Sequence, residues 1–204
     1  MTIDLSGKLP GASIPPFFNA PGKQVPYVTG HYYPPVSFIP DPYTGGMGAG
    51  RLSFVPFIPK ETYTFKGIAS WQDDAGDSGG LIRMGIYTSD SDGAPDSLIV
   101  DGGEIVLPAS TGLRISVISE ELIKNTLYYL TIGSDISYDT LRVETAALIK
   151  QPVLPMRGIR AIDITTTGPY GYYFDLSVYS YGPLPATASA FETTTGPAIV
   201  FLEG

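Results

Sequence analysis

Cysteine is absent from this chain of 204 residues, and histidine occurs once, as His31. Without cysteine the chain has no disulfide framework, no thiolate metal site and no cysteine nucleophile. Its absence is compatible with synthesis in a reducing cytosol. The single histidine also leaves no matched set of acid and base for hydrolytic catalysis.

Charged residues are scarce, at 16% of the chain, and the net charge is −8. Proteins that bind nucleic acid neutralise phosphates with clustered Lys and Arg, so we predict no nucleic-acid partner. No run of about 18 apolar residues occurs, and the N-terminal sequence lacks the basic region and apolar run of a signal peptide. We therefore expect neither secretion nor membrane spanning.

Glycine and proline are abundant, with 24 and 19 residues, which argues against long helices. The hydrophobic fraction of 43% is sufficient for a buried core. Because few charges remain to solvate the surface, we expect a partner to cover part of it.

Residues 1–49 are predicted to form an extended arm that precedes a domain at 50–204. Proline removes amide donors and favours extended backbone, so we expect no regular strand or helix in the arm. The segment is also aromatic, unlike solvated linkers. Two interpretations stay open: the arm lies on a partner surface, or it folds back over its own domain. Its prolines are Pro10, Pro15, Pro16, Pro21, Pro26, Pro34, Pro35, Pro40 and Pro42.

The domain at 50–204 has short apolar runs separated by turn residues about every ten positions, which is typical of an all-β sandwich or barrel. We predict two antiparallel sheets packed as a jelly-roll-like β-sandwich. Residues 120–125 could form one helical turn, which is too short to be a structural layer. The expected strands are 51–58, 63–71, 81–88, 97–100 with 104–107, 112–119, 127–133, 141–148, 171–180 and 198–202.

Residues 171–180 alternate cleanly, so one face is expected in the core and the other in solvent or at an interface. Tyrosine crowds this segment, at Tyr170, Tyr172, Tyr173, Tyr179 and Tyr181, and Trp71 is the only tryptophan. These aromatic side chains are consistent with a protein interface, with plain packing or with glycan contact. The run at 198–202 either returns as a last strand or pairs with a neighbouring subunit.

The sequence GDSGG at 76–80 resembles the nucleophile loop of trypsin-like serine proteases. A serine nucleophile requires a histidine base that a carboxylate orients. The only histidine is His31, and the chain before Ser78 is too short for the upstream barrel of those enzymes. We interpret the loop as a glycine-rich turn between two strands.

Acidic residues gather at three other places. Asp90 and Asp92 have the spacing that begins a calcium loop, but the twelfth position holds Asp101 instead of a bidentate Glu, so a turn is expected. Asp73, Asp74 and Asp77 share a loop, and Glu120 neighbours Glu121; sequence spacing does not place either group across a glycosidase cleft. We predict no catalytic, cofactor-binding or metal-binding residues and no cofactor.

Several strand sequences resemble those of small tailed-phage virion proteins, in the same order. These are GRLSFVPFIP at 50–59, YTFKGI at 63–68, LIRMGIY at 81–87, GAPDSLI at 93–99 and LYYL at 127–130. The sequence departs from that pattern at Asp96, where glycine is usual, and at Asn125 and Thr126, which replace Pro-Gly. The resemblance implies a jelly-roll-like virion accessory part and no catalytic residues.

From these features we expect a non-enzymatic protein of the virion, assembled in the host cytoplasm. The preferred hypothesis is a capsid decoration, or cement, protein that docks on the phage head through its arm. Its expected partners are the major capsid protein or other virion subunits and further copies of itself, as a homotrimer. The alternative is a tail-fibre or receptor-binding module that contacts host glycans.

Overall fold

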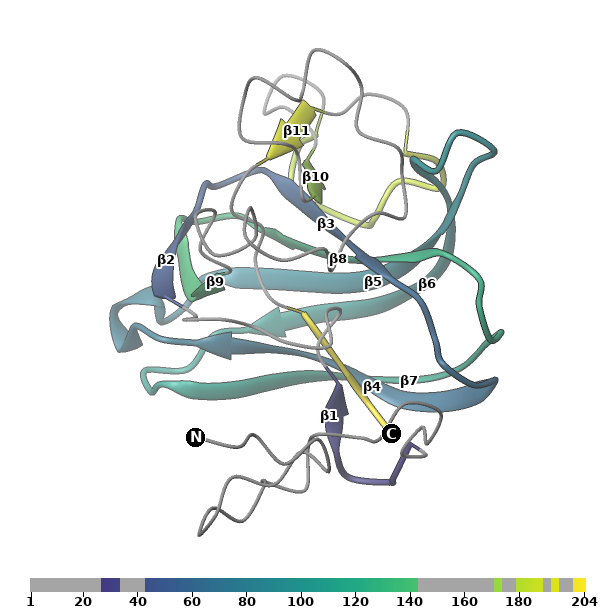
Figure 1. Cartoon of the computed structure of the whole chain (residues 1–204). Coiled ribbons are helices and arrows are strands. Elements are labelled where there is room, and N and C mark those ends of the chain that lie inside the picture. The colour runs from purple at the N-terminus through teal and green to yellow at the C-terminus, as the bar shows by residue number, and fades with distance from the viewer. Residues whose placement is uncertain (1–26, 34–42, 143–170, 174–178, 189–191, 195–199) are drawn as a thin grey trace, which may run out of the picture.

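The computed structural model describes residues 27–33, 43–142, 171–173, 179–188, 192–194 and 200–204. These residues form two antiparallel sheets packed against each other, which is a β-sandwich (Figure 1). The predicted all-β fold class is therefore confirmed. The one helical element among the described residues is a short 3-10 turn at Ala75–Asp77. No helix in these ranges has the length and apolarity to cross a bilayer.

The first sheet, sheet A, has five strands in order and a sixth strand that pairs with the third of them. The row runs β1 (Tyr32–Tyr33), β12 (Phe201–Glu203), β4 (Tyr63–Gln72), β9 (Tyr138–Arg142) and β2 (Tyr43–Met47), and β7 (Gly112–Leu122) pairs with β4. The second sheet, sheet B, runs β11 (Glu192–Thr194), β10 (Gly171–Tyr173), β3 (Leu52–Phe57), β8 (Tyr128–Ser134), β5 (Leu81–Ser89) and β6 (Pro95–Val106).

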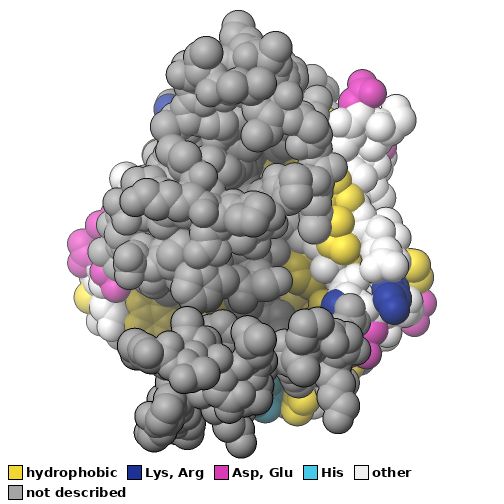
Figure 2. Space-filling view, in the orientation of Figure 1, with side chains coloured by type: hydrophobic (Ala, Val, Ile, Leu, Met, Phe, Trp, Pro, Cys, Tyr) yellow, Lys and Arg dark blue, Asp and Glu magenta, His cyan; other side chains and the backbone are white. Residues whose placement is uncertain are grey.

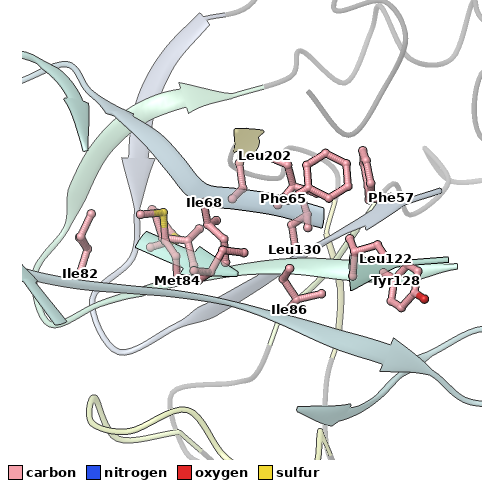
Figure 3. Close-up of a cluster of buried hydrophobic side chains, with 14 of the residues drawn as sticks. Phe57, Phe65, Ile68, Ile82, Met84, Ile86, Leu122, Tyr128, Leu130 and Leu202 are labelled. Carbon is pink, nitrogen blue, oxygen red and sulfur yellow. The ribbon is translucent and has the colours of Figure 1, made fainter. Parts of the chain in front are cut away.

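The main core lies between the two sheets. Alternate side chains of β5, Ile82, Met84 and Ile86, point into it and are fully buried. Phe65 and Ile68 of β4 face them from sheet A (Figure 3). Burial of these side chains is the main source of stability, at about 1.5–3 kcal/mol for each large apolar side chain.

A second core covers the opposite face of sheet B. Phe54 of β3 and Tyr87 of β5 meet there edge to face, with ring centroids 5.1 Å apart. Tyr179 and Leu184 lie over them and are buried. Because both faces of sheet B are covered, every residue of β8 is buried, which explains its nearly continuous apolar sequence.

The segment at 179–188 is held on sheet B by backbone hydrogen bonds along β6. Leu98 N donates to Ala186 O at 2.9 Å, and Ala188 N donates to Asp96 O at 2.7 Å. The hydroxyl of Tyr87 donates to Pro185 O at 2.7 Å. The segment therefore protects the first part of this edge strand as well as covering the sheet.

The strands expected at 51–58, 63–71, 81–88, 112–119 and 127–133 are confirmed as β3, β4, β5, β7 and β8. The two short runs at 97–100 and 104–107 are parts of a single strand, β6, which is interrupted by a bulge. Gly103 has a φ of 82° there, and the Asp101 side chain accepts from its N–H, so the local chain bends without ending the strand.

The helical turn that residues 120–125 could form is not observed. Glu120 and Glu121 continue β7 and pair with Phe65 and Thr64 of β4. Continuing the strand buries Leu122 in the main core, which a lone helical turn would not do. The turn that follows is tight, and Asn125 takes the left-handed conformation with a φ of 60°.

The C-terminal strands lie only partly within the described residues. Of the strand expected at 171–180, residues Gly171–Tyr173 form β10, residues 174–178 lie outside the described residues, and Tyr179 belongs to the covering segment. The run at 198–202 supplies β12, which pairs with β1 and β4 of the same chain. The strand expected at 141–148 begins earlier, as β9, and its remainder lies outside the described residues.

The expectation that residues 1–49 contain no regular strand is wrong for β1 and β2. Both belong to sheet A, and Met47 of β2 is buried in the main core. A boundary at residue 50 therefore separates these strands from their own sheet. Residues 1–26 and 34–42 lie outside the described residues, so an attachment role for the arm stays a prediction.

Truncating Ile86 should test the main core. We expect Ile86→Ala to lower the free energy of unfolding by about 2–5 kcal/mol, because a fully buried side chain leaves a cavity. Ile123→Ala, at a side chain that is 47% exposed, is the matched control and should change it by about 0.5 kcal/mol or less. Urea denaturation of both variants measures the difference, and equal losses would contradict this core.

Candidate functional site

The GDSGG sequence forms the connection between β4 and β5. The Asp74 side chain accepts from Gly76 N at 2.7 Å and begins the 3-10 turn. Gly79 has a φ of 85°, which favours glycine. A Cβ on Gly80 would lie 2.2 Å from Ile136 Cδ1, so this position requires glycine for close packing. The motif is used here to turn the chain.

Ser78 and His31 are not brought together by the fold. Ser78 is exposed, and within the described residues its hydroxyl makes no hydrogen bond. His31 is exposed beside β1, where its Nδ1 lies 3.4 Å from Thr29 O and its carbonyl accepts from Gly204 N at 2.9 Å. Neither side chain has the nucleophile and base geometry that acyl transfer requires.

Asp77 has a structural contact in this loop. Its carboxylate is buried and accepts from Asp139 N of β9 at 3.0 Å. Burial raises the pKa of Asp77, although the hydrogen bond from the Asp139 backbone opposes the shift. Asp73 N donates to Asp139 O at 2.9 Å, so the loop is fixed to β9 at two points.

A buried glutamine that pairs with a half-buried arginine beneath the same loop was not indicated by the sequence. Gln72 at the end of β4 accepts from Arg114 Nε of β7 at 2.7 Å. Its amide nitrogen donates to Asp74 O at 2.8 Å and to Pro108 O at 3.1 Å. Gln72 thus satisfies backbone carbonyls of two loops, which is the usual role of a buried amide.

The carboxylates of Asp90, Glu120 and Glu121 each have a local structural setting. The Asp90 carboxylate accepts from Asp92 N at 2.9 Å and from Ala94 N at 2.7 Å, which is the geometry of an Asx turn. Glu120 and Glu121 are neighbours on a strand, so their side chains point to opposite faces. Among the described residues, no group of three or more Asp, Glu or His side chains is placed to hold a metal ion.

The tyrosine-rich segment contributes mainly to packing in the part that the structure describes. Tyr179 is buried in the second core, and its hydroxyl donates to Gly182 O at 3.2 Å. Tyr181 is half-buried near Arg83, which pairs with Asp101 at 2.9 Å. Burial raises the pKa of Tyr181. Tyr170 lies outside the described residues.

The outward face of sheet A carries apolar side chains that reach solvent. In β7, Val117 is 84% exposed and Ile115 is 39% exposed, and Trp71 of β4 is 36% exposed. Leu113 pairs with Trp71 across the strands, and Phe201 of β12 pairs with Ala69. We call Trp71, Leu113, Ile115, Val117 and Phe201 the apolar face of sheet A.

On the face seen in Figure 2, the visible charged side chains do not form one cluster. In the view of Figure 2, acidic and basic side chains gather in small groups toward the margins, and apolar side chains reach the surface between them.

The N-terminal segment is anchored to the sandwich by Tyr27. Its ring packs against Phe65 and Tyr63, with centroids 4.9 and 5.3 Å away, and Lys60 Nζ lies 4.8 Å above it. Tyr27 N donates to Glu61 Oε1 at 2.6 Å, and the Tyr27 hydroxyl accepts from Lys60 N at 3.2 Å. The point at which residues 1–26 join the sandwich is therefore fixed.

Replacing Asp77 should change how stability depends on pH. Because its pKa is raised in the folded chain, the folded state binds this proton more tightly, and stability falls as pH rises from about 4 through the folded pKa. Asp77→Asn lacks this effect, so its free energy of unfolding should rise relative to that of the original chain over this range. Ser78→Ala, an exposed neighbour that does not titrate, is the control. A difference for Asp77→Asn that does not vary between about pH 3 and 7 would contradict the assignment.

Comparison with known proteins leaves the family of this chain open. No protein-family model matches it, and no curated protein matches it. What the chain does must therefore be inferred from its own residues and surfaces.

Proposed function

We propose that this chain is a non-enzymatic structural protein of a tailed-phage particle, a decoration protein that docks on the head through residues 1–26. The observation that carries the proposal is the anchor at Tyr27. Residues 1–26 hold five of the 19 prolines of the chain, and they are joined to the sandwich at Tyr27 by a buried ring, a cation over that ring and two hydrogen bonds. A fixed junction of this kind would hold the sandwich domain close to a surface on which residues 1–26 dock.

The composition and the surface support the same proposal. Only 16% of the residues are charged, and the outward face of sheet A exposes Val117, Ile115 and Trp71. Exposed apolar patches on a folded domain mark sites of contact with other proteins. The partners we propose are the major capsid protein or another virion subunit, together with further copies of this chain. The resemblance of residues 50–132 to tailed-phage virion proteins favours this setting.

A glycan-binding module of a tail fibre is the second candidate. The exposed ring of Trp71 favours it, because its Nε1 donates to Asp73 Oδ1 at 3.3 Å and holds the indole beside a carboxylate. Aromatic rings with a nearby polar group are suited to stacking on sugars. Binding of host-surface glycans that is lost in Trp71→Ala, without loss of particle attachment, would favour this alternative.

Removing residues 1–26 should test the proposed docking element. The shortened chain keeps Tyr27, β1 and β2, so we expect it to fold and to keep its thermal stability. It should no longer sediment with heads assembled without this protein, whereas the full chain should sediment with them. Circular dichroism and co-sedimentation measure the two properties.

The same experiment defines the opposing result. If the shortened chain is folded and attaches to heads as well as the full chain does, residues 1–26 are not the docking element. If the full chain itself does not attach to heads, the decoration role is wrong.

A further inference from the structure

We propose that the apolar face of sheet A is the contact surface between two copies of this chain. The biological setting of this contact rests on the proposed assembly role. The contact itself does not, because self-association is measured on the isolated chain. It assigns a named surface to a two-fold dimer, whereas the oligomer expected from the sequence is a homotrimer.

The geometry of β4 and β7 places the exposed apolar side chains on one face. Trp71 is directly opposite Leu113, and Gly67 is directly opposite Val117. Directly opposed residues of an antiparallel pair project to the same side of a sheet. Between these two rows, Ile115 and Phe201 flank Ala69 and leave it fully buried. The side chains therefore form one contiguous patch.

The inner face of the same strands accounts for the rest of the apolar residues. Ile118 and Leu122 of β7 and Ile68 of β4 are buried in the main core. The outward side chains are therefore not part of the core. Val117 is the most exposed of them, at 84%. An apolar patch of this kind gains stability when another surface removes it from water.

Charge at the ends of the patch favours a second copy as the occupant. Lys66 is exposed near the beginning of β4, and the Asp73 carboxylate lies just after the end of this strand, beside Trp71. Among the described residues neither side chain is in an ion pair. When two such faces meet with their β4 strands antiparallel, Lys66 lies opposite Asp73 of the partner subunit, and this happens twice.

The five side chains of the apolar face are uncharged, and the charged side chain beside them is Glu203, in a chain with a net charge of −8. Glu203 lies at the Lys66 end, because it pairs with Gly67 and would be 2.7 Å from a Cβ placed there. Opposite charges at the rim and apolar side chains at the centre are the usual composition of a protein interface. Association through this face therefore covers the apolar side chains of both copies and places Lys66 near Asp73 of the partner subunit.

Sedimentation velocity of the full chain over a range of concentrations tests the proposal. We expect the original chain to self-associate, and Val117→Asp to raise its dissociation constant at least about tenfold, because it places a carboxylate in an apolar contact. The matched control is Val106→Asp on β6, where the side chain is 63% exposed but belongs to sheet B. Val106→Asp should associate as the original chain does. Circular dichroism establishes that both variants are folded.

A charge exchange tests the register independently of the apolar centre. Lys66→Asp and Asp73→Lys should each weaken association, and the double variant should restore it, because the two charges are exchanged across the interface. Two results overturn the proposal: a folded original chain that stays monomeric at all concentrations, or a folded Val117→Asp variant that associates unchanged. Attachment to heads is measured separately, so failure of this interface leaves the docking proposal standing.

Discussion

The constraint on which this structure depends is that sheet B must be covered on both faces. β8 lies at its centre and is buried throughout, and Tyr87 and Phe54 project away from the main core. Left in water, these side chains would expose a large apolar surface. The covering segment approaches so closely that a Cβ on Gly85 would lie 2.3 Å from Leu184 Cδ1. The domain therefore has a third, irregular layer, fixed by its hydrogen bonds along β6.

The two sheets consequently have different roles. Sheet B is an interior layer, whereas sheet A has one face in the main core and one face toward solvent. The acidic side chains of the loops make structural hydrogen bonds. Asp77 accepts one from the backbone of β9, and Asp90 accepts one within its own turn. The features left to consider for function are therefore surfaces of the domain. The apolar face of sheet A is a feature that the fold does not require to turn or close the chain, and Tyr27 joins the N-terminal segment to the main core.

Local pattern predicted most of the central strands but not how the chain ends are placed. β4, β5 and β8 were predicted from their apolar residues, because a buried strand produces a local pattern of apolar side chains in consecutive residues. β1 was not predicted because a strand of two residues is too short to show an alternation of apolar and polar side chains. It forms by pairing with β12, about 170 positions later in the chain. Residues 120–122 were misread because a long-range pairing with β4 outweighed a local helical preference. The apolar face was missed because β7 has apolar residues on both faces, and sequence alone does not say which face is covered.

The measurement that tests the assembly role most directly is the number of copies of this chain in purified phage particles, obtained by quantitative mass spectrometry against the major capsid protein. A decoration protein repeats with the capsid lattice, so hundreds of copies per particle are expected. A few copies would place the chain in a tail or fibre and contradict docking across the head. Absence from purified particles would contradict a structural role in the virion altogether.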